Sequence, residues 1–131
     1  MYRENTVSEI TLPSTVPTLD TTNLESIGTS RSFLIEVCNS FLADAPSRIH
    51  ELEIALQQAE KQTLIQTAHA LKSLSSCIGA MRLFQICQFV EHASKEGRDI
   101  VSNTITQQIA TEYNNVQLAI QNYKNAQSIT L

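Results

Sequence analysis

The residues best suited to chemistry lie in one short segment, residues 68–80 of the chain. On a helix, Lys72 and Ser73 lie on the same side as His69, because they follow it by three and four residues. A neutral imidazole nitrogen is a nucleophile near neutral pH, and a neighbouring ammonium offsets the charge of an incoming anion. Between Lys61 and Val90 the chain has three Lys or Arg residues and no acidic residue. The pattern indicates a nucleophilic histidine on a locally positive surface.

A helix running from about Lys61 to Cys77 is expected to position this histidine. Its apolar or small positions are spaced by four and three residues and form one face: Leu64, Ala68, Leu71, Ser75 and Ile78. His69 is one position beyond Ala68, so we expect it at the edge of that face with its imidazole at the surface. Gly79 follows where a left-handed helix cap would sit.

The rest of the chain predicts further amphipathic helices. Asp20 is expected to cap a short helix through Ile27, with Gly28 just beyond it. Helical spacing begins at Ser30, and Pro46 either kinks one long helix or starts a second one. The next helix is expected to end at Gly97. The apolar positions that these helices are expected to bury in a bundle are Phe33, Leu34, Val37, Phe41, Leu42, Ile49, Leu52, Leu56, Leu83, Ile86, Cys87, Val90, Ile105, Ile109, Tyr113, Val116, Ile120 and Tyr123.

These elements predict an all-α fold, an antiparallel four-helix bundle with a short extra N-terminal helix. With 131 residues, the chain fits one domain, which we place at residues 20–125. Residues 1–19 are rich in Thr, Ser and Pro and are expected to form a flexible segment or linker. Residues 126–131 are expected to be a C-terminal tail.

The composition excludes several classes of protein. A net charge of −4 offers no basic surface for nucleic acid or an anionic membrane. No apolar run is long enough to span a membrane, and the N-terminus lacks the apolar stretch of a signal peptide. Cys38, Cys77 and Cys87 are expected to be buried small hydrophobes in a reducing compartment. We therefore expect a cytoplasmic protein.

The segment around His69 resembles the signature of histidine phosphotransfer domains, which is His-x-x-Lys-Gly followed by small residues and a Gly-Ala pair. His69, Lys72, Gly79 and Ala80 match this signature, and Ser73 stands where the family usually has glycine.

The resemblance extends beyond the signature. Residues 33–46 (FLIEVCNSFLADAP) resemble the first bundle helix of the family, and Arg82–Glu91 resemble the helix after the site. The resemblance covers about residues 20–125.

The resemblance implies a carrier that accepts a phosphoryl group on His69 from a receiver-domain phospho-aspartate and passes it to another aspartate. Lys72 would offset the phosphoryl charge and, as a surface lysine, would contribute little to stability. Glu91 would orient the imidazole, with Gln88 as the alternative, although Glu91 could equally be one more exposed acid. Gly79 could equally be only a helix cap.

The resemblance also implies partners. The expected partner surface consists of Ile65, Ser73, Ser76 and Gly79, with Ile65 as an exposed apolar residue. The partners would be receiver domains, and the chain is expected to be monomeric. It requires no cofactor or metal of its own, since Mg²⁺ is expected on the receiver. Whether it stands alone or was excised from a hybrid histidine kinase stays open.

Other classes of protein fit less well. The phosphoacceptor domain of a sensor kinase typically has an acidic residue after its histidine, whereas Ala70 follows His69, and no glycine-rich ATP-binding part follows. A non-catalytic adaptor bundle would tolerate the loss of His69. An enzyme with Ser73 or Cys77 as nucleophile lacks an evident base and pocket. Zinc is disfavoured because the chain has no Cys-x-x-Cys pair.

Overall fold

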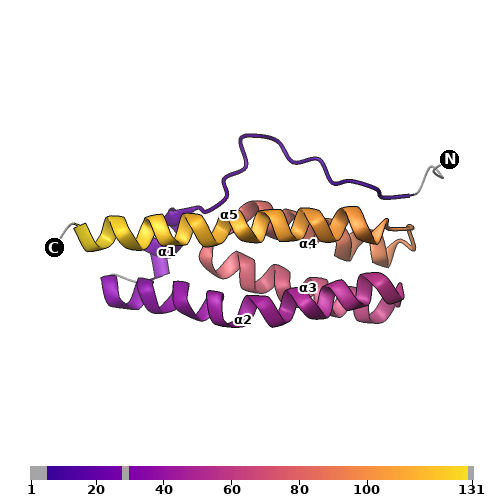
Figure 1. Ribbon diagram of the computed structural model, residues 1–131, viewed down its shortest axis with the longest axis horizontal. Helices are drawn as coiled ribbons and strands as arrows, with labels where there is room; N and C mark the ends of the chain where they lie inside the picture. Colours follow the sequence, from indigo (N-terminus) through magenta and orange to yellow (C-terminus); the bar gives the residue numbers. More distant parts are fainter. Residues whose placement is uncertain (1–5, 28–29, 130–131) are drawn as a thin grey trace.

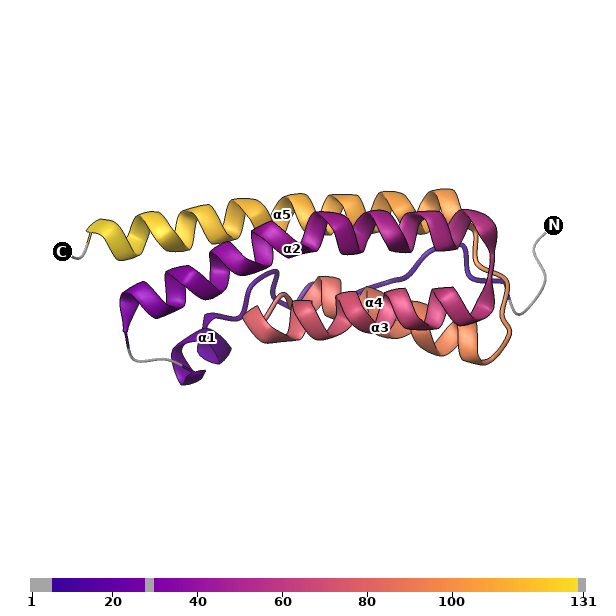
Figure 2. The ribbon, with the colours of Figure 1, turned by 90° about the horizontal axis from the view of Figure 1, so that it is seen from below.

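The structure is a computed structural model that describes residues 6–27 and 30–129. Its elements are α1 (Thr21–Ile27), α2 (Arg31–Gln58), α3 (Lys61–Ile78), α4 (Met81–Lys95) and α5 (Ser102–Ile129). The four long helices run antiparallel to one another in chain order (Figures 1 and 2). The predicted all-α bundle with a short extra N-terminal helix is therefore confirmed. Within the described ranges, the β-structure consists of an isolated parallel bridge between Val7 and Ile100.

Helix α2 begins at a side-chain cap, because the hydroxyl of Ser30 accepts a hydrogen bond from the backbone N–H of Phe33 at 3.1 Å. Pro46 lies inside this helix, so the alternative of a second helix starting there is wrong. Figure 2 shows the axis of α2 bending near its middle. A proline ring displaces the preceding turn of a helix, but the helix continues when packing holds the segments on both sides of the proline. The kinked helix that the sequence offered as one alternative is therefore confirmed.

Helix α3 ends where the sequence placed its stop. Gly79 has a φ of 78°, a left-handed conformation that favours glycine, and its N–H bonds back to the last turn. A side chain here would also collide with the carbonyl oxygen of Asp20. Asp20 in turn donates its backbone N–H to the Gly79 carbonyl at 2.7 Å and caps α1 through Thr22 at 3.0 Å. Gly28, the expected end of α1, lies outside the described residues.

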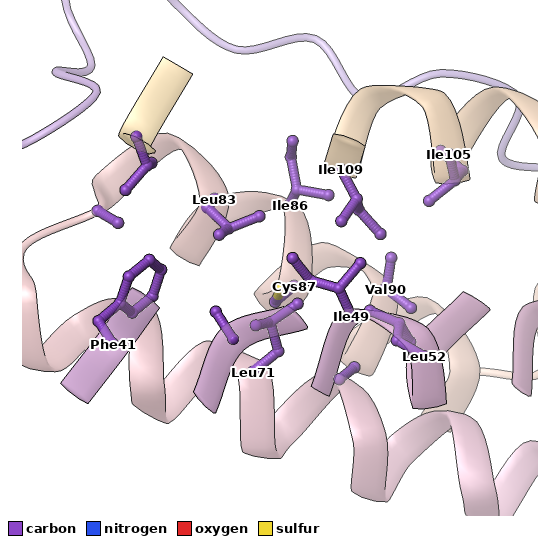
Figure 3. Packing of buried hydrophobic residues seen from close by; sticks show 14 of the residues in the cluster. Phe41, Ile49, Leu52, Leu71, Leu83, Ile86, Cys87, Val90, Ile105 and Ile109 are labelled. Carbon is purple, nitrogen blue, oxygen red and sulfur yellow. The ribbon is translucent and has the colours of Figure 1, made fainter. Parts of the chain in front are cut away.

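The core fills the space between the helices with aliphatic side chains (Figure 3). All five positions of the predicted α3 face are buried, as are the four predicted positions of α4. Two expectations for α2 and α3 are wrong. Phe33 is 42% exposed, and Cys77 is exposed, whereas Cys38 and Cys87 are buried as predicted. Phe33 and Cys77 both line a hollow between α2 and α3, at the edge of the predicted core faces.

The segment before α1, residues 6–20, packs on the bundle, and we call it the N-terminal strap. Its residues Val7 and Ile10 are buried in the core. The backbone of Val7 pairs with the loop between α4 and α5, and the backbone of Ile10 exchanges two hydrogen bonds with the side chain of Gln108. Figure 1 shows the strap running lengthwise along the bundle. The prediction of a flexible segment over residues 1–19 is therefore wrong for the part that the structure describes.

The C-terminal end also differs from expectation. Helix α5 continues to Ile129, so residues 126–129 are helical and not a separate tail. None of the described helices is long and apolar enough to cross a membrane.

Candidate functional site

Helices α3 and α4 bring an exposed histidine against a buried carboxylate. The Nδ1 atom of His69 lies 3.1 Å from Oε2 of Glu91. The side chain of His69 is 60% exposed, whereas that of Glu91 is 4% exposed. Both positions follow from helix geometry, because His69 is one residue beyond the buried Ala68, and Glu91 follows the buried Val90.

Two lysines, Lys72 and Lys95, also contact the carboxylate of Glu91. The Nζ of Lys72 lies 2.7 Å from Oε1, a distance typical of an ion pair although the contact is not aligned as a hydrogen bond. The Nζ of Lys95 lies 3.2 Å from Oε2, the same oxygen that faces His69. A buried carboxylate with three donors around it is costly to neutralise, because protonation would leave the two ammonium groups without a counter-charge.

The pKa of Glu91 reflects this balance. Burial alone would raise the pKa of the carboxyl above its usual 4.5, but the contacts with Lys72, Lys95 and His69 outweigh burial and lower the pKa to about 2. Glu91 is therefore ionised throughout the physiological range of pH, and its oxygens act only as hydrogen-bond acceptors.

This fixes the tautomer of the neutral imidazole. Because Oε2 of Glu91 can only accept, the Nδ1 of His69 must carry the proton and donate it. The lone pair of the neutral ring is then on Nε2, the nitrogen that does not bond to Glu91. The arrangement presents a nucleophilic nitrogen on a largely exposed ring, with two ammonium groups nearby.

The structure brings together three of the predicted site residues, His69, Lys72 and Glu91. The expectation of a surface lysine is wrong for Lys72, whose side chain is only 20% exposed and is paired with Glu91. Sequence reasoning missed Lys95. Its signal was the spacing, since a lysine four residues after a glutamate on a helix is placed to form an ion pair with it.

Gln88 does not serve as the alternative orienting residue. The hydrogen bond to His69 comes from Glu91, whereas Gln88 lines a hollow between α4 and the N-terminal strap, together with Leu12 and Phe89. Gln88 precedes Glu91 by only three residues, and sequence spacing alone could not decide which of the two faced α3.

The four predicted partner residues have different surroundings. Ser73 and Ser76 are exposed. Ile65 is partly buried, so the expectation of an exposed apolar residue is wrong. Gly79 is buried beneath Asp20, so it serves as a helix cap and is not available as a contact surface.

Two hollows between α2 and α3 adjoin one another beside Ser73. The first, of about 480 Å³, is lined by Ser73 together with Ser47 and Arg48 of α2. The second, of about 350 Å³, is lined by apolar side chains that include Phe33. Leu74 and Cys77 line both. The exposed aromatic ring thus extends a continuous depression toward the helix face that carries Ser73.

Metal ligands do not gather at this site. Among the described residues, no group of three or more His, Cys, Asp or Glu side chains could hold a metal ion. The groups that contact one another at this site are an imidazole, a carboxylate and two ammonium groups.

Comparison with known proteins identifies the class. The sequence model of the Hpt domain matches residues 36–119, which include His69, Lys72, Glu91 and Lys95. The chain belongs to the Hpt domain family, and its role is histidine phosphotransfer in two-component phosphorelays. Hpt domains are phosphocarrier modules and not kinases, and they interact with receiver domains.

Two solved structures are similar in fold. The histidine-containing phosphotransfer protein B (HptB) of Pseudomonas aeruginosa PAO1 has a TM-score of 0.75 and 26% identity, over 86% of this chain and 98% of that one. The Hpt domain of a sensor hybrid histidine kinase from Shewanella has a TM-score of 0.68 and 21% identity, over 83% of this chain and 95% of that one. No curated protein sequence matches the chain.

Proposed function

We propose that His69 carries the phosphoryl group. It takes this group from the phospho-aspartate of a receiver domain and passes it to the aspartate of another. The observation that carries the proposal is the contact of 3.1 Å between Nδ1 of His69 and the ionised Glu91, on a ring that is mostly exposed. This contact assigns the proton to Nδ1 and the nucleophilic lone pair to Nε2.

The transfer balances without moving a proton. The Nε2 lone pair forms a bond to phosphorus while the bond from phosphorus to the aspartyl oxygen breaks, and the aspartate leaves as a carboxylate with the electron pair. The imidazole keeps its Nδ1 proton and becomes a phosphorylated imidazolium, whose positive charge faces Glu91. In the return step the same bonds change in reverse, and the neutral imidazole is the leaving group.

Lys72 and Lys95 have complementary roles in this proposal. Lys72 is paired with Glu91 and only 20% of its side chain is exposed, so its charge is held close to the residue that contacts the ring. Lys95 is more than half exposed and can turn from Glu91 toward phosphoryl oxygens on Nε2. Both ammonium groups stabilise the negative charge of the transferring group, which is the main contribution a carrier makes to phosphoryl transfer.

The receiver is proposed to dock over the α3 face that carries Ser73 and Ser76. Their small side chains leave room for close approach, and the depression next to Ser73 offers apolar area that ends at Phe33. Ile65, one turn before His69 on the same side, would contribute only its exposed part. The receiver, which needs an acidic metal pocket for its own aspartate, would supply the Mg²⁺.

The remaining features of the proposal concern the whole protein. The chain acts as a monomeric carrier with no kinase activity, serving receivers that are free or part of a hybrid histidine kinase. The cytoplasmic location expected from the sequence stays a prediction. A non-catalytic adaptor is not favoured, because the chain belongs to a phosphotransfer family.

The test is phosphotransfer from a panel of phosphorylated receiver domains, followed by mapping of the acid-labile, base-stable label. We expect label on His69 and none on His69→Gln, with the helical circular dichroism unchanged. His50→Gln and His92→Gln are matched controls, because both residues are exposed and neither belongs to the charge cluster around Glu91. Label that persists on His69→Gln, or that maps to either control histidine, would overturn the assignment. An adaptor would bind its receiver equally well with or without label.

A further inference from the structure

A second polar hollow lies at the end of the bundle where α3 begins and α4 ends. It has a volume of about 280 Å³ and is separate from the contacts of His69. Lys61 is eight residues before His69, which corresponds to about 12 Å along a helix axis. The lining combines the apolar side chains of Leu56 and Leu64 with polar groups at the helix ends.

The hydroxyl of Ser94 is the first indication of a ligand. Ser94 lines the hollow and is only 4% exposed, and its Oγ has no hydrogen-bond partner among the residues that the structure describes. A serine inside a helix commonly satisfies its hydroxyl by bonding to the carbonyl four residues earlier, as Ser75 does with Leu71. Leaving a buried hydroxyl without a partner is unfavourable, so a group in the hollow that accepts its hydrogen bond would be stabilised.

The start of α3 is the second indication, because no side chain of the described residues caps its first backbone N–H groups. Glu60, at the N-cap position, makes no side-chain capping bond, and the first turn holds no acidic residue. The first N–H groups of any helix lack partners within the helix and carry the positive end of its dipole. Lys61 adds an ammonium group to the lining, which also includes the carboxylate of Asp99, whereas the guanidinium of Arg98 lies over the ring of Phe89.

We propose that this hollow binds a small oxyanion, a phosphate monoester with a short apolar substituent. The oxyanion would accept hydrogen bonds from the Ser94 hydroxyl and from the uncapped first turn of α3, beside the ammonium of Lys61. The substituent would lie against Leu56 and Leu64.

The test is a titration followed by amide ¹H–¹⁵N spectra, with butyl phosphate, inorganic phosphate, and chloride at matched ionic strength. We expect saturable shifts for amides at the start of α3 and around residues 94–99, tighter for butyl phosphate than for phosphate by about tenfold. Chloride should give only small shifts that do not saturate. Equal affinity for the two phosphates would show that the apolar substituent does not bind against Leu56 and Leu64, and it would overturn the proposal.

Variants locate the site. Ser94→Ala removes only the hydroxyl and should weaken binding of butyl phosphate by about tenfold, since a hydrogen bond to a charged group is lost. Lys61→Gln should weaken it by several-fold, whereas Lys124→Gln, which removes the same charge from α5, should leave it unchanged. Unchanged binding by Ser94→Ala, or shifts confined to the amides around His69 and Lys72, would show that the anion binds elsewhere and overturn the proposal.

Discussion

Replacing Glu91 by glutamine tests the charge arrangement behind the site. The change keeps the size of the side chain but removes the negative charge that His69, Lys72 and Lys95 surround. The pKa of this carboxyl lies at about 2 instead of 4.5, because the three contacts outweigh the effect of burial. At about 1.4 kcal/mol per pH unit, the ionised form contributes roughly 3 kcal/mol to folding at pH 7. E91Q should therefore be less stable than the wild type by up to about 3 kcal/mol.

The stability lost in E91Q depends on pH, and the lowered pKa of Glu91 determines the direction of this dependence. The folded chain holds the pKa of Glu91 below its unfolded value, so the stabilisation is complete above about pH 4.5 and is lost as the pH falls through about 2. The difference in unfolding free energy between wild type and E91Q should accordingly shrink to roughly half of its pH 7 value at pH 3. Chemical denaturation followed by circular dichroism at pH 7, 4 and 3 measures it.

Glu96→Gln is the matched control. Glu96 follows Lys95 in the chain, is exposed, and is not one of the groups around His69. Its replacement should change the stability by less than about 0.5 kcal/mol at every pH. A wild-type advantage over E91Q that is as large at pH 3 as at pH 7 would refute the electrostatic account, as would equal stability of E91Q and E96Q at pH 7.

The E91Q variant also separates two effects of Glu91 on phosphotransfer, the orientation of the His69 ring and the negative charge beside it. In E91Q the amide oxygen of the introduced glutamine would still accept a hydrogen bond from Nδ1 of His69, so the ring keeps its tautomer. The imidazolium formed on phosphorylation, however, loses its counter-charge. We expect the rate of transfer from a receiver to fall by about tenfold, the effect of losing one charge-assisted hydrogen bond. An unchanged rate in a folded E91Q protein would show that Glu91 acts only on stability.

Substitutions at Lys72, Ser73 and Ile10 have defined outcomes. Lys72→Ala should lower the transfer rate and also cost about 2 kcal/mol, because it breaks a largely buried ion pair; a loss under about 0.5 kcal/mol would restore the view of a solvated lysine. Ser73→Phe should severely impair transfer from a cognate receiver while Ser73→Gly hardly affects it, and equal rates would place the docking face elsewhere. Ile10→Ala should cost about 2–4 kcal/mol of stability, as for other buried isoleucines, whereas the exposed Ile54→Ala costs little; equal effects would mean that the N-terminal strap is not docked in solution.

The bundle was largely predictable because its helices satisfy local rules. Periodicity located the buried face of α3, and glycine marked the ends of α3 and α4, since both Gly79 and Gly97 adopt positive φ. These features depend on residues within a few positions of one another, so a single sequence contains them. The sequence allowed a kink at Pro46 but could not decide for it, because the packing that holds the two halves in one helix involves other elements.

The N-terminal strap could not be predicted because its partners are distant in the sequence. Ile10 is paired with Gln108, and Val7 with the loop at Asp99 to Val101. An extended segment buries isolated side chains without a helical period, and its Thr, Ser and Pro content is equally typical of a linker. The same limit applies to Glu91, because only the packing of α4 on α3 decides whether Gln88 or Glu91 faces His69.

The charges at the site explain why a buried carboxylate with two lysines suits a reversible carrier. Before transfer, one carboxylate and two ammonium groups surround a neutral ring, and the site has a net positive charge. The proposed transfer would add a phosphoryl group with two negative charges and convert the ring to an imidazolium with one positive charge, which would bring the total to neutral. We infer that neither state is strongly favoured by electrostatics alone. A carrier with fewer cations would hold a repelled phosphoryl group, and one without Glu91 would leave the phosphorylated imidazolium without its counter-charge.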